Sequence, residues 1–232
     1  MSSESEAASA PLAPAKPAIL SVILGLFIAF SWPLILRIPG VSNHDITNIH
    51  DDAVDVLLKW VVTAILCVVA FSIQHKRPSE FGIRALRWRD SLVALGCVVI
   101  AFMLSGAASR VVAMPSSLSS VQKLAAVPVS LRIAVVLTAA ICEEFMYRGF
   151  GIEELAFMTG NRWLAGFLSW FLFTFSHAGL YGLSPALIIP GLVGAVLTAL
   201  YLWRRNLVSC ILMHAIMDGI FLLLVPAIAG AR

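Results

Sequence analysis

Two adjacent glutamates and an arginine lie inside an apolar stretch, in ICEEFMYRGF at residues 141–150. An ionisable group in lipid costs at least ~2.5 kcal/mol, so such a group marks a function or a neutralising pair. Glu144 and Arg148 are four residues apart, on one helical face, and can pair. Glu143 points about 100° round the helix from Glu144. Glu143 therefore stays free to act as a general base, although an ion-paired packing device remains an alternative.

Two histidines and an aspartate follow in later apolar stretches. FLFTFSHAG carries His177 about fourteen residues into its stretch, close to the depth expected for Glu143. In MHAIMD, His214 and Asp218 are four apart, so the carboxylate can orient the imidazole, as in catalytic triads. Each residue alone also fits a satisfied packing position. Together, a glutamate, a histidine and a His–Asp pair on three helices indicate a catalytic site.

The composition indicates that these residues belong to a polytopic membrane protein. The chain has 232 residues, of which 60% are hydrophobic and 12% charged, and its mean hydropathy is +0.94. Soluble domains average about 45–50% apolar and about 25% charged residues. The net charge of +3 is too small and too scattered to suggest nucleic acid, so no nucleic-acid partner is expected.

Seven apolar spans are predicted, each long enough to cross a hydrocarbon core of about 30 Å. Because they lack the period of two of barrel strands, they predict an all-α bundle of about seven transmembrane helices. We expect residues 1–17 to form a disordered tail. Residues 18–232 are expected to form a single transmembrane domain. The spans are 18–38, 53–74, 90–113, 129–152, 163–180, 184–203 and 206–229.

The loops predict the orientation. Segment 75–89 carries five Lys and Arg residues, whereas segment 39–52 carries three aspartates and neither Lys nor Arg. By the positive-inside rule the first loop faces the cytoplasm. The N-terminus is then cytoplasmic and the C-terminus lies on the far side.

Five further ionisable residues fall near predicted span ends. Arg132 is expected to snorkel toward the membrane surface. The same solvated or snorkelling position is expected for Asp55, Lys59, Asp90 and Arg110.

The three polar groups resemble the motifs of the CPBP family, the intramembrane glutamic endopeptidases that include type II CAAX prenyl endopeptidases and bacterial Abi proteins. Those motifs look like EExxxR, FxxxH and HxxxN/D. This chain has Glu143 to Arg148 as EEFMYR, Phe173 to His177 as FTFSH, and His214 to Asp218 as HAIMD. Their order and spacing match on successive hydrophobic helices, over about residues 129–220.

The resemblance implies a membrane-embedded endopeptidase. Glu143 and His177 would activate the attacking water, while Glu144 and Arg148 would order the first motif. His214 would stabilise the oxyanion, an interaction often worth ~2.7–4 kcal/mol per donor. Asp218 stands where the family often has asparagine and lacks an N–H to donate, so a supporting role toward His214 is expected.

Three alternatives remain open. Glu143, His177 and His214 form a familiar zinc ligand set, although HExxH is absent and no cofactor is expected. Intramembrane charges also build transporters, but no repeated halves are visible. A non-catalytic bacteriocin-immunity protein is the third. The expected partners are a lipid bilayer and a membrane-associated protein or peptide substrate, and the expected location is the bacterial inner membrane. The oligomeric state is open.

Overall fold

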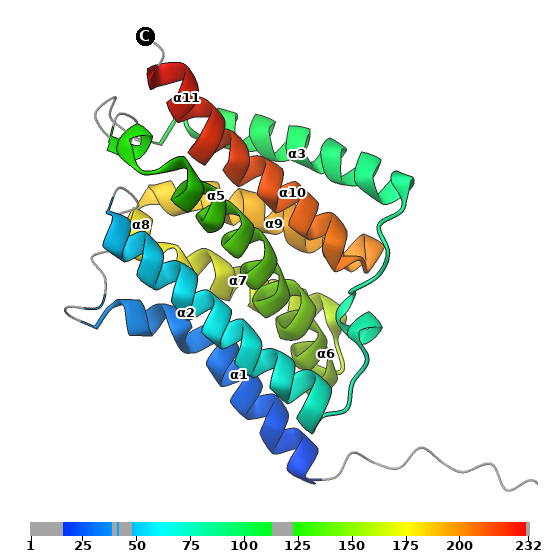
Figure 1. Ribbon diagram of the computed structural model, residues 1–232. Coiled ribbons are helices and arrows are strands. Elements are labelled where there is room, and N and C mark those ends of the chain that lie inside the picture. The colour runs from blue at the N-terminus through cyan, green and yellow to red at the C-terminus, as the bar shows by residue number, and fades with distance from the viewer. Residues whose placement is uncertain (1–15, 39–40, 42–47, 113–122, 231–232) are drawn as a thin grey trace, which may run out of the picture.

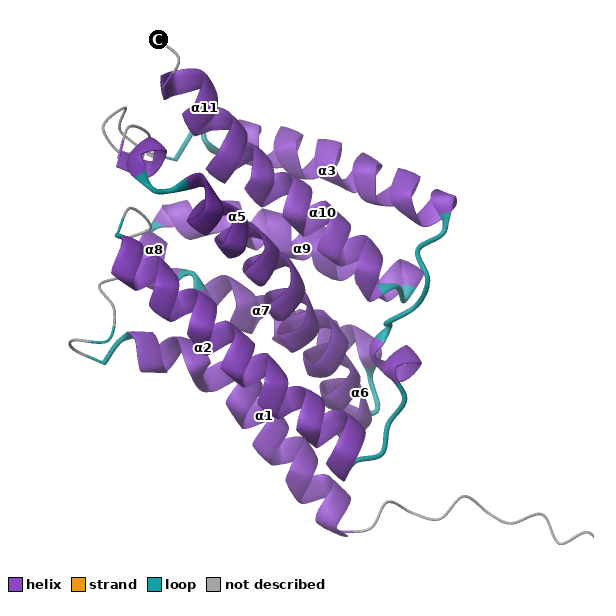
Figure 2. Cartoon of the chain, viewed as in Figure 1, coloured by secondary structure: helices purple, strands orange, loops and turns teal. Residues whose placement is uncertain are grey.

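The computed structural model describes residues 16–38, 41, 48–112 and 123–230, and this part of the chain is helical without a strand (Figures 1 and 2). The predicted tail lies outside the described residues, apart from Lys16 and Pro17, which begin the first helix. The all-α prediction is confirmed for the described residues.

The first half of the chain forms α1 (Lys16–Leu36), α2 (Ile49–Cys67) with its π-helical continuation η1 (Val68–Ile73), the short turn η2 (Pro78–Phe81), and α3 (Trp88–Ala108). The second half forms α5 (Val129–Thr138), the π-helix η3 (Ala139–Ile152), α6 (Glu153–Thr159), α7 (Arg162–Ser176), α8 (Ala178–Tyr181), η4 (Pro185–Leu187), α9 (Ile188–Arg204), α10 (Leu207–Gly219), η5 (Ile220–Leu224) and α11 (Val225–Gly230).

Five described helices are long and apolar enough to cross a membrane, and the chain is an integral membrane protein. They are Ile19–Leu36, Ile49–Ile73, Trp88–Ala108, Pro185–Arg204 and Leu207–Ile228. The predicted spans 129–152 and 163–180 are not among them. The first carries Glu143, Glu144 and Arg148 within one stretch, and α7 has only 15 residues, about 22 Å of helix.

One rod occupies the centre of the bundle. α5, η3 and α6 run on without a break, because the residues at both junctions keep right-handed helical dihedral angles. Figure 1 shows this rod passing between α2 and α10, and it also contacts α1 and α7. Every residue of η3 except Ile141 is buried. The charged motif therefore faces other helices and not lipid.

The prediction of one continuous helix over residues 163–180 is wrong. α7 ends at Ser176, and His177 lies in the turn that follows. The reason is competition for the carbonyl of Phe173, which accepts hydrogen bonds from the hydroxyl of Ser176 (2.7 Å) and from Nδ1 of His177 (2.9 Å). The backbone N–H of His177 donates instead to the carbonyl of Thr174. Local side-chain bonds of this kind replace the helical pattern.

A second group of charges gathers where the 74–87 loop, the α6–α7 turn and the α9–α10 turn meet at one end of the bundle (Figure 1). Glu153 accepts from the hydroxyl of Tyr201 at 2.7 Å, and Glu154 pairs with Lys76 at 2.5 Å. We call this group the end cluster. Its members are Lys76, Asp90, Glu153, Glu154, Arg162, Tyr201, Arg204 and Arg205.

Asp90 belongs to this cluster, which corrects the expectation that it is solvated. It is buried, and its Oδ1 accepts from Nε of Arg204 at 2.9 Å. The arginine at the end of α9 thereby ties that helix to the start of α3.

Candidate active site

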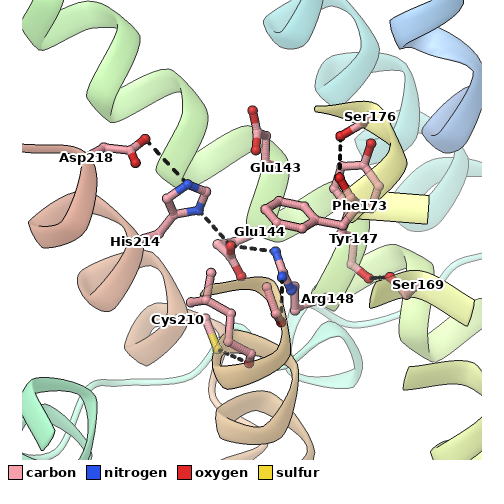
Figure 3. A network of polar contacts seen from close by, with 12 residues as sticks. Glu143, Glu144, Tyr147, Arg148, Ser169, Phe173, Ser176, Cys210, His214 and Asp218 are labelled. Atoms are coloured by element: carbon pink, nitrogen blue, oxygen red, sulfur yellow. Dashed lines mark hydrogen bonds and ion pairs between the residues drawn. The ribbon is translucent and has the colours of Figure 1, made fainter. Parts of the chain in front are cut away.

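Three helices carry the motif residues, and Figure 3 shows the contacts among Glu144, Arg148, His214 and Asp218 in the interior of the bundle. η3 supplies Glu143, Glu144 and Arg148, the end of α7 supplies His177, and α10 supplies His214 and Asp218. π-Helical turns occur frequently at functional sites, because the extra residue re-aims side chains relative to an α-helix. Here the π-helix carries both glutamates of the first motif.

Glu144 is the hub of this arrangement. Its Oε1 accepts from Nη1 of Arg148 at 2.8 Å and from Nδ1 of His214 at 2.7 Å. The predicted pairing of Glu144 with Arg148 is thus confirmed. The contact with His214 was not predicted, and it makes Glu144 the link between η3 and α10.

Arg148 is fully buried and held from three directions. Besides pairing with Glu144, its Nη2 donates to the carbonyl of Gly194 at 3.1 Å, and its guanidinium lies 4.1 Å from the ring centroid of Phe173. Gly194 permits this close packing of α9, because a Cβ there would lie 2.7 Å from the Phe173 ring. A buried guanidinium with a carboxylate, a carbonyl and an aromatic face is well compensated.

His214 lies between two carboxylates. Nδ1 faces Glu144, and Nε2 lies 3.4 Å from Oδ2 of Asp218, so the predicted His214–Asp218 proximity on one face of α10 is confirmed. Because Glu144 is the shorter contact, it fixes the ring more firmly than Asp218 does. Glu144 therefore shares with Asp218 the supporting role toward His214 that was expected of Asp218.

His177 is half-buried and its tautomer follows from its partner. A carbonyl only accepts, so Nδ1 of His177 donates to the carbonyl of Phe173 and Nε2 is left as an acceptor. The Phe173 ring contacts both imidazoles, with centroid distances of 4.7 Å to His177 and 6.4 Å to His214. Both histidines therefore border one site.

Glu143 completes the site. It interacts electrostatically with His177 and with His214. Its Oε1 lies 2.7 Å from Nζ of Lys59 on α2, and its buried Oε2 has no hydrogen-bond partner among the described residues. The free oxygen is the one that can take a proton.

Lys59 and its neighbour Asp55 are the site residues that the sequence prediction missed. Lys59 was expected to snorkel, but it is buried and pairs with Asp55 at 2.6 Å as well as with Glu143. The usable signal was their spacing of four on an otherwise apolar helix face, which is the spacing of His214 and Asp218.

Arg132 was also misassigned, for a structural reason away from the site. It is buried and donates to the carbonyls of Val127 (3.1 Å) and Leu222 (3.0 Å), which ties α5 to η5. Arg110 is exposed, as expected for a residue near a span end.

The zinc alternative requires Glu143, His177 and His214 to point lone pairs at one ion. In the structure Oε1 of Glu143 pairs with the ammonium of Lys59, and Nε2 of His214 faces Oδ2 of Asp218. Across the described ranges, no three His, Cys, Asp or Glu side chains are grouped so that they could hold a metal ion. As arranged, this residue set does not fit zinc.

Comparison with known proteins gives one match. Residues 125–220 match the model of the family described as Type II CAAX prenyl endopeptidase Rce1-like, which confirms the resemblance carried by the three motifs and implies a protease. No curated protein and no solved structure matches the chain. The matched segment contains Glu143, Glu144, Arg148, His177, His214 and Asp218, and it is similar to the Rce1-like type II CAAX prenyl endopeptidases.

Proposed function

We propose that the chain is an intramembrane endopeptidase that hydrolyses a peptide bond in a membrane-associated protein or peptide, without a metal ion. The observation that carries this proposal is that Glu143, with an unpartnered Oε2, lies next to Glu144, which contacts His214, while the Phe173 ring contacts both imidazoles inside the family segment. Peptide hydrolysis within a bilayer needs such a polar pocket, which explains why charges are kept there.

The attacking water binds between Oε2 of Glu143 and Nε2 of His177. Glu143 accepts a proton from this water as its oxygen attacks the scissile carbonyl, and His177 orients the water through its acceptor nitrogen. Support for these roles comes from the unpartnered Oε2 of Glu143 and from the Phe173 carbonyl, which leaves Nε2 of His177 as the acceptor.

His214 stabilises the oxyanion of the tetrahedral intermediate. In its imidazolium form, which two carboxylates flank, His214 donates from Nδ1 to Glu144 and has a second N–H at Nε2. The Nε2–Asp218 separation of 3.4 Å exceeds the usual 2.7–3.2 Å, so this second donor is held loosely. A substrate oxygen displaces Asp218 as its acceptor at small cost.

The intermediate then collapses. The peptide C–N bond breaks, and Glu143 returns its proton to the leaving amine. The products are a new carboxylic acid and a new amine, which ionise to a carboxylate and an ammonium, and Glu143 is again ionised beside Lys59. Arg148 stays paired with Glu144 throughout, so its role is to position the hub and not to touch the substrate.

The membrane placement is part of the proposal. Seven crossings arise if the central rod from α5 to α6 and the short helix α7 span together with the five apolar helices. The end cluster, with its Lys and Arg residues, then faces the cytoplasm together with the N-terminus. The assignment to a bacterial inner membrane rests on the family resemblance and the compact chain.

The test compares membrane peptides in cells that produce the wild type, Glu143→Ala or His177→Ala at equal levels. We expect cleaved products that appear with the wild type and are absent with both variants. Identical peptide populations in the three strains would contradict proteolysis. If Glu143→Ala protected cells from a bacteriocin as well as the wild type does, the non-catalytic immunity alternative would be supported instead.

A further inference from the structure

We propose that Lys59, anchored by Asp55, is a positioning residue for the Glu143 carboxylate. Lys59 pairs with Oε1 of Glu143, which leaves the buried Oε2 without a hydrogen-bond partner among the described residues. This inference rests on the proposed function, because it assigns the group that orients the general base. It adds α2 to a site that the family segment alone does not include, since α2 lies before residue 125.

Lys59 is held in place by several short contacts. Nζ lies 2.7 Å from Oε1 of Glu143 and 2.6 Å from Oδ2 of Asp55, and it lies 5.2 Å from the ring centroid of Trp32. The exposed fractions of the Lys59 and Glu143 side chains are 8% and 6%. An ammonium has three N–H donors. Two carboxylates and an aromatic face surround this one.

α2 is fixed against the central rod close to this contact. Nε1 of Trp60, the residue after Lys59, donates to Oγ1 of Thr138 at 2.9 Å, one residue before η3 begins. The ion pair and this hydrogen bond join the same two helices. Lys59 is therefore held at a fixed position along η3, within 2.7 Å of Glu143.

A packing role alone does not account for the residue types. Burying an ion pair costs desolvation that well-packed apolar side chains avoid, so such a pair is weak evidence for stability. The charged or titratable groups that interact with Glu143 are Lys59 from α2, His177 from the turn after α7, and His214 from α10. Of these three, Lys59 is the one with an ion pair to Glu143, at 2.7 Å.

Asp55 explains how Lys59 stays in place during turnover. When Glu143 takes the proton of the attacking water, its carboxyl becomes neutral and its attraction for the ammonium weakens. Asp55 keeps its charge and its 2.6 Å contact, so Lys59 does not lose all compensation. The Lys59–Asp55 pair can therefore keep Lys59 in position in both protonation states of Glu143.

The first experiment measures kcat and KM for Lys59→Met, Lys59→Arg and Lys76→Met in proteoliposomes. The probe is a fluorogenic peptide that contains a cleavage site found in the cell comparison. We expect a loss of about 10²-fold in kcat with little change in KM for Lys59→Met, which is the scale of a misplaced reacting group. Lys59→Arg should recover most of that loss, because it keeps a cation.

Lys76→Met is the matched control. Lys76 also forms an interhelical pair with a buried glutamate, Glu154, but in the end cluster. Its removal should leave kcat unchanged. Wild-type kcat in Lys59→Met, or a loss confined to KM, would overturn the inference.

The second experiment needs no substrate. A double-mutant cycle measures thermal unfolding of the detergent-solubilised wild type, Lys59→Met, Glu143→Gln and the double variant. We expect the double variant to be more stable than the two single losses predict, because neither charge is then left unpaired. Additive losses would overturn the pairing. If the wild type cleaves nothing, the proposed function fails, and this cycle still decides whether the Lys59–Glu143 contact exists.

Discussion

Two pairs of adjacent glutamates lie ten residues apart on the same rod, and their partners differ. Glu143 and Glu144 face His177 and His214, together with one lysine and one arginine. The second pair, Glu153 and Glu154, belongs to the end cluster and faces Lys76, Arg162, Arg205 and the hydroxyl of Tyr201.

The difference shows what turns a buried carboxylate pair into a site. Arginine and lysine keep their charge at neutral pH, so the end cluster forms a fixed set of ion pairs that joins loops and helices. Imidazoles change protonation in the physiological range and can both accept and donate. Two adjacent glutamates in the sequence therefore do not by themselves predict a catalytic site. Two adjacent glutamates that face two histidines do.

The sharpest contrast is expected between Glu143→Gln and Glu153→Gln. The amide at position 143 cannot take a proton, so kcat should fall about 10²–10⁴-fold, the usual contribution of a general base. Glu153→Gln removes an acceptor of the end cluster and should leave kcat near the wild-type value. Peptide cleavage in proteoliposomes, with protein amounts matched, measures both. Equal losses of kcat in the two variants would contradict the proposed difference between the Glu143–Glu144 pair and the Glu153–Glu154 pair.

The second contrast concerns stability. Arg148→Met leaves Glu144 as a buried charge beside a histidine alone, and should lower the free energy of unfolding by ~3–5 kcal/mol. Arg205→Met, at a side chain that is 27% exposed, should cost about 0–1 kcal/mol. Denaturant titration in mixed micelles gives both values. A similar cost for the two arginines would mean that the interior pair is no more desolvated than the end cluster.

His214→Ala removes the proposed oxyanion donor. We expect kcat to fall about 10²–10³-fold with KM little changed, because the donated bond strengthens only in the transition state. Steady-state kinetics on the fluorogenic peptide separate the two parameters. A rise in KM at constant kcat would instead assign His214 to substrate binding.

Asp218→Asn should have a smaller effect. Because Glu144 already fixes the His214 ring at 2.7 Å, we expect kcat within about tenfold of the wild type, or ~1.4 kcal/mol. The same kinetic assay measures it beside His214→Ala. A loss as large as that of His214→Ala would show that Asp218, and not Glu144, is the essential partner.

Chelation should have the smallest effect of all. The cation next to Glu143 is the ammonium of Lys59, and Nε2 of His214 faces Asp218. Exhaustive dialysis against a chelator should leave kcat unchanged. Loss of activity that added zinc restores would contradict the metal-free mechanism.

Sequence reasoning predicted contacts within one helix better than contacts between helices. Glu144–Arg148 and His214–Asp218 follow from a spacing of four, since that spacing places side chains on one face. Glu144–His214 and Lys59–Glu143 depend on which helices pack side by side, which periodicity does not encode. Lys59 was missed because its position near a predicted span end was given more weight than its spacing from Asp55.

The same limit applies to the helix ends. Hydrophobic runs indicated helices over 129–152 and 163–180, but not that the first is π-helical through both glutamates or that the second ends at Ser176. These features depend on individual bonds, such as the capture of the Phe173 carbonyl by two side chains. The hydrophobic pattern of the sequence does not predict these individual bonds.

The central claim is that Glu143 and His177, supplied by separate helices, act on one water molecule. The kcat of the double variant Glu143→Gln/His177→Ala tests it most directly, measured beside each single variant in proteoliposomes. Groups that act as a unit give non-additive losses, so the double variant should be no slower than the slower single variant. Losses that multiply, or a double variant that retains wild-type kcat, would contradict the account.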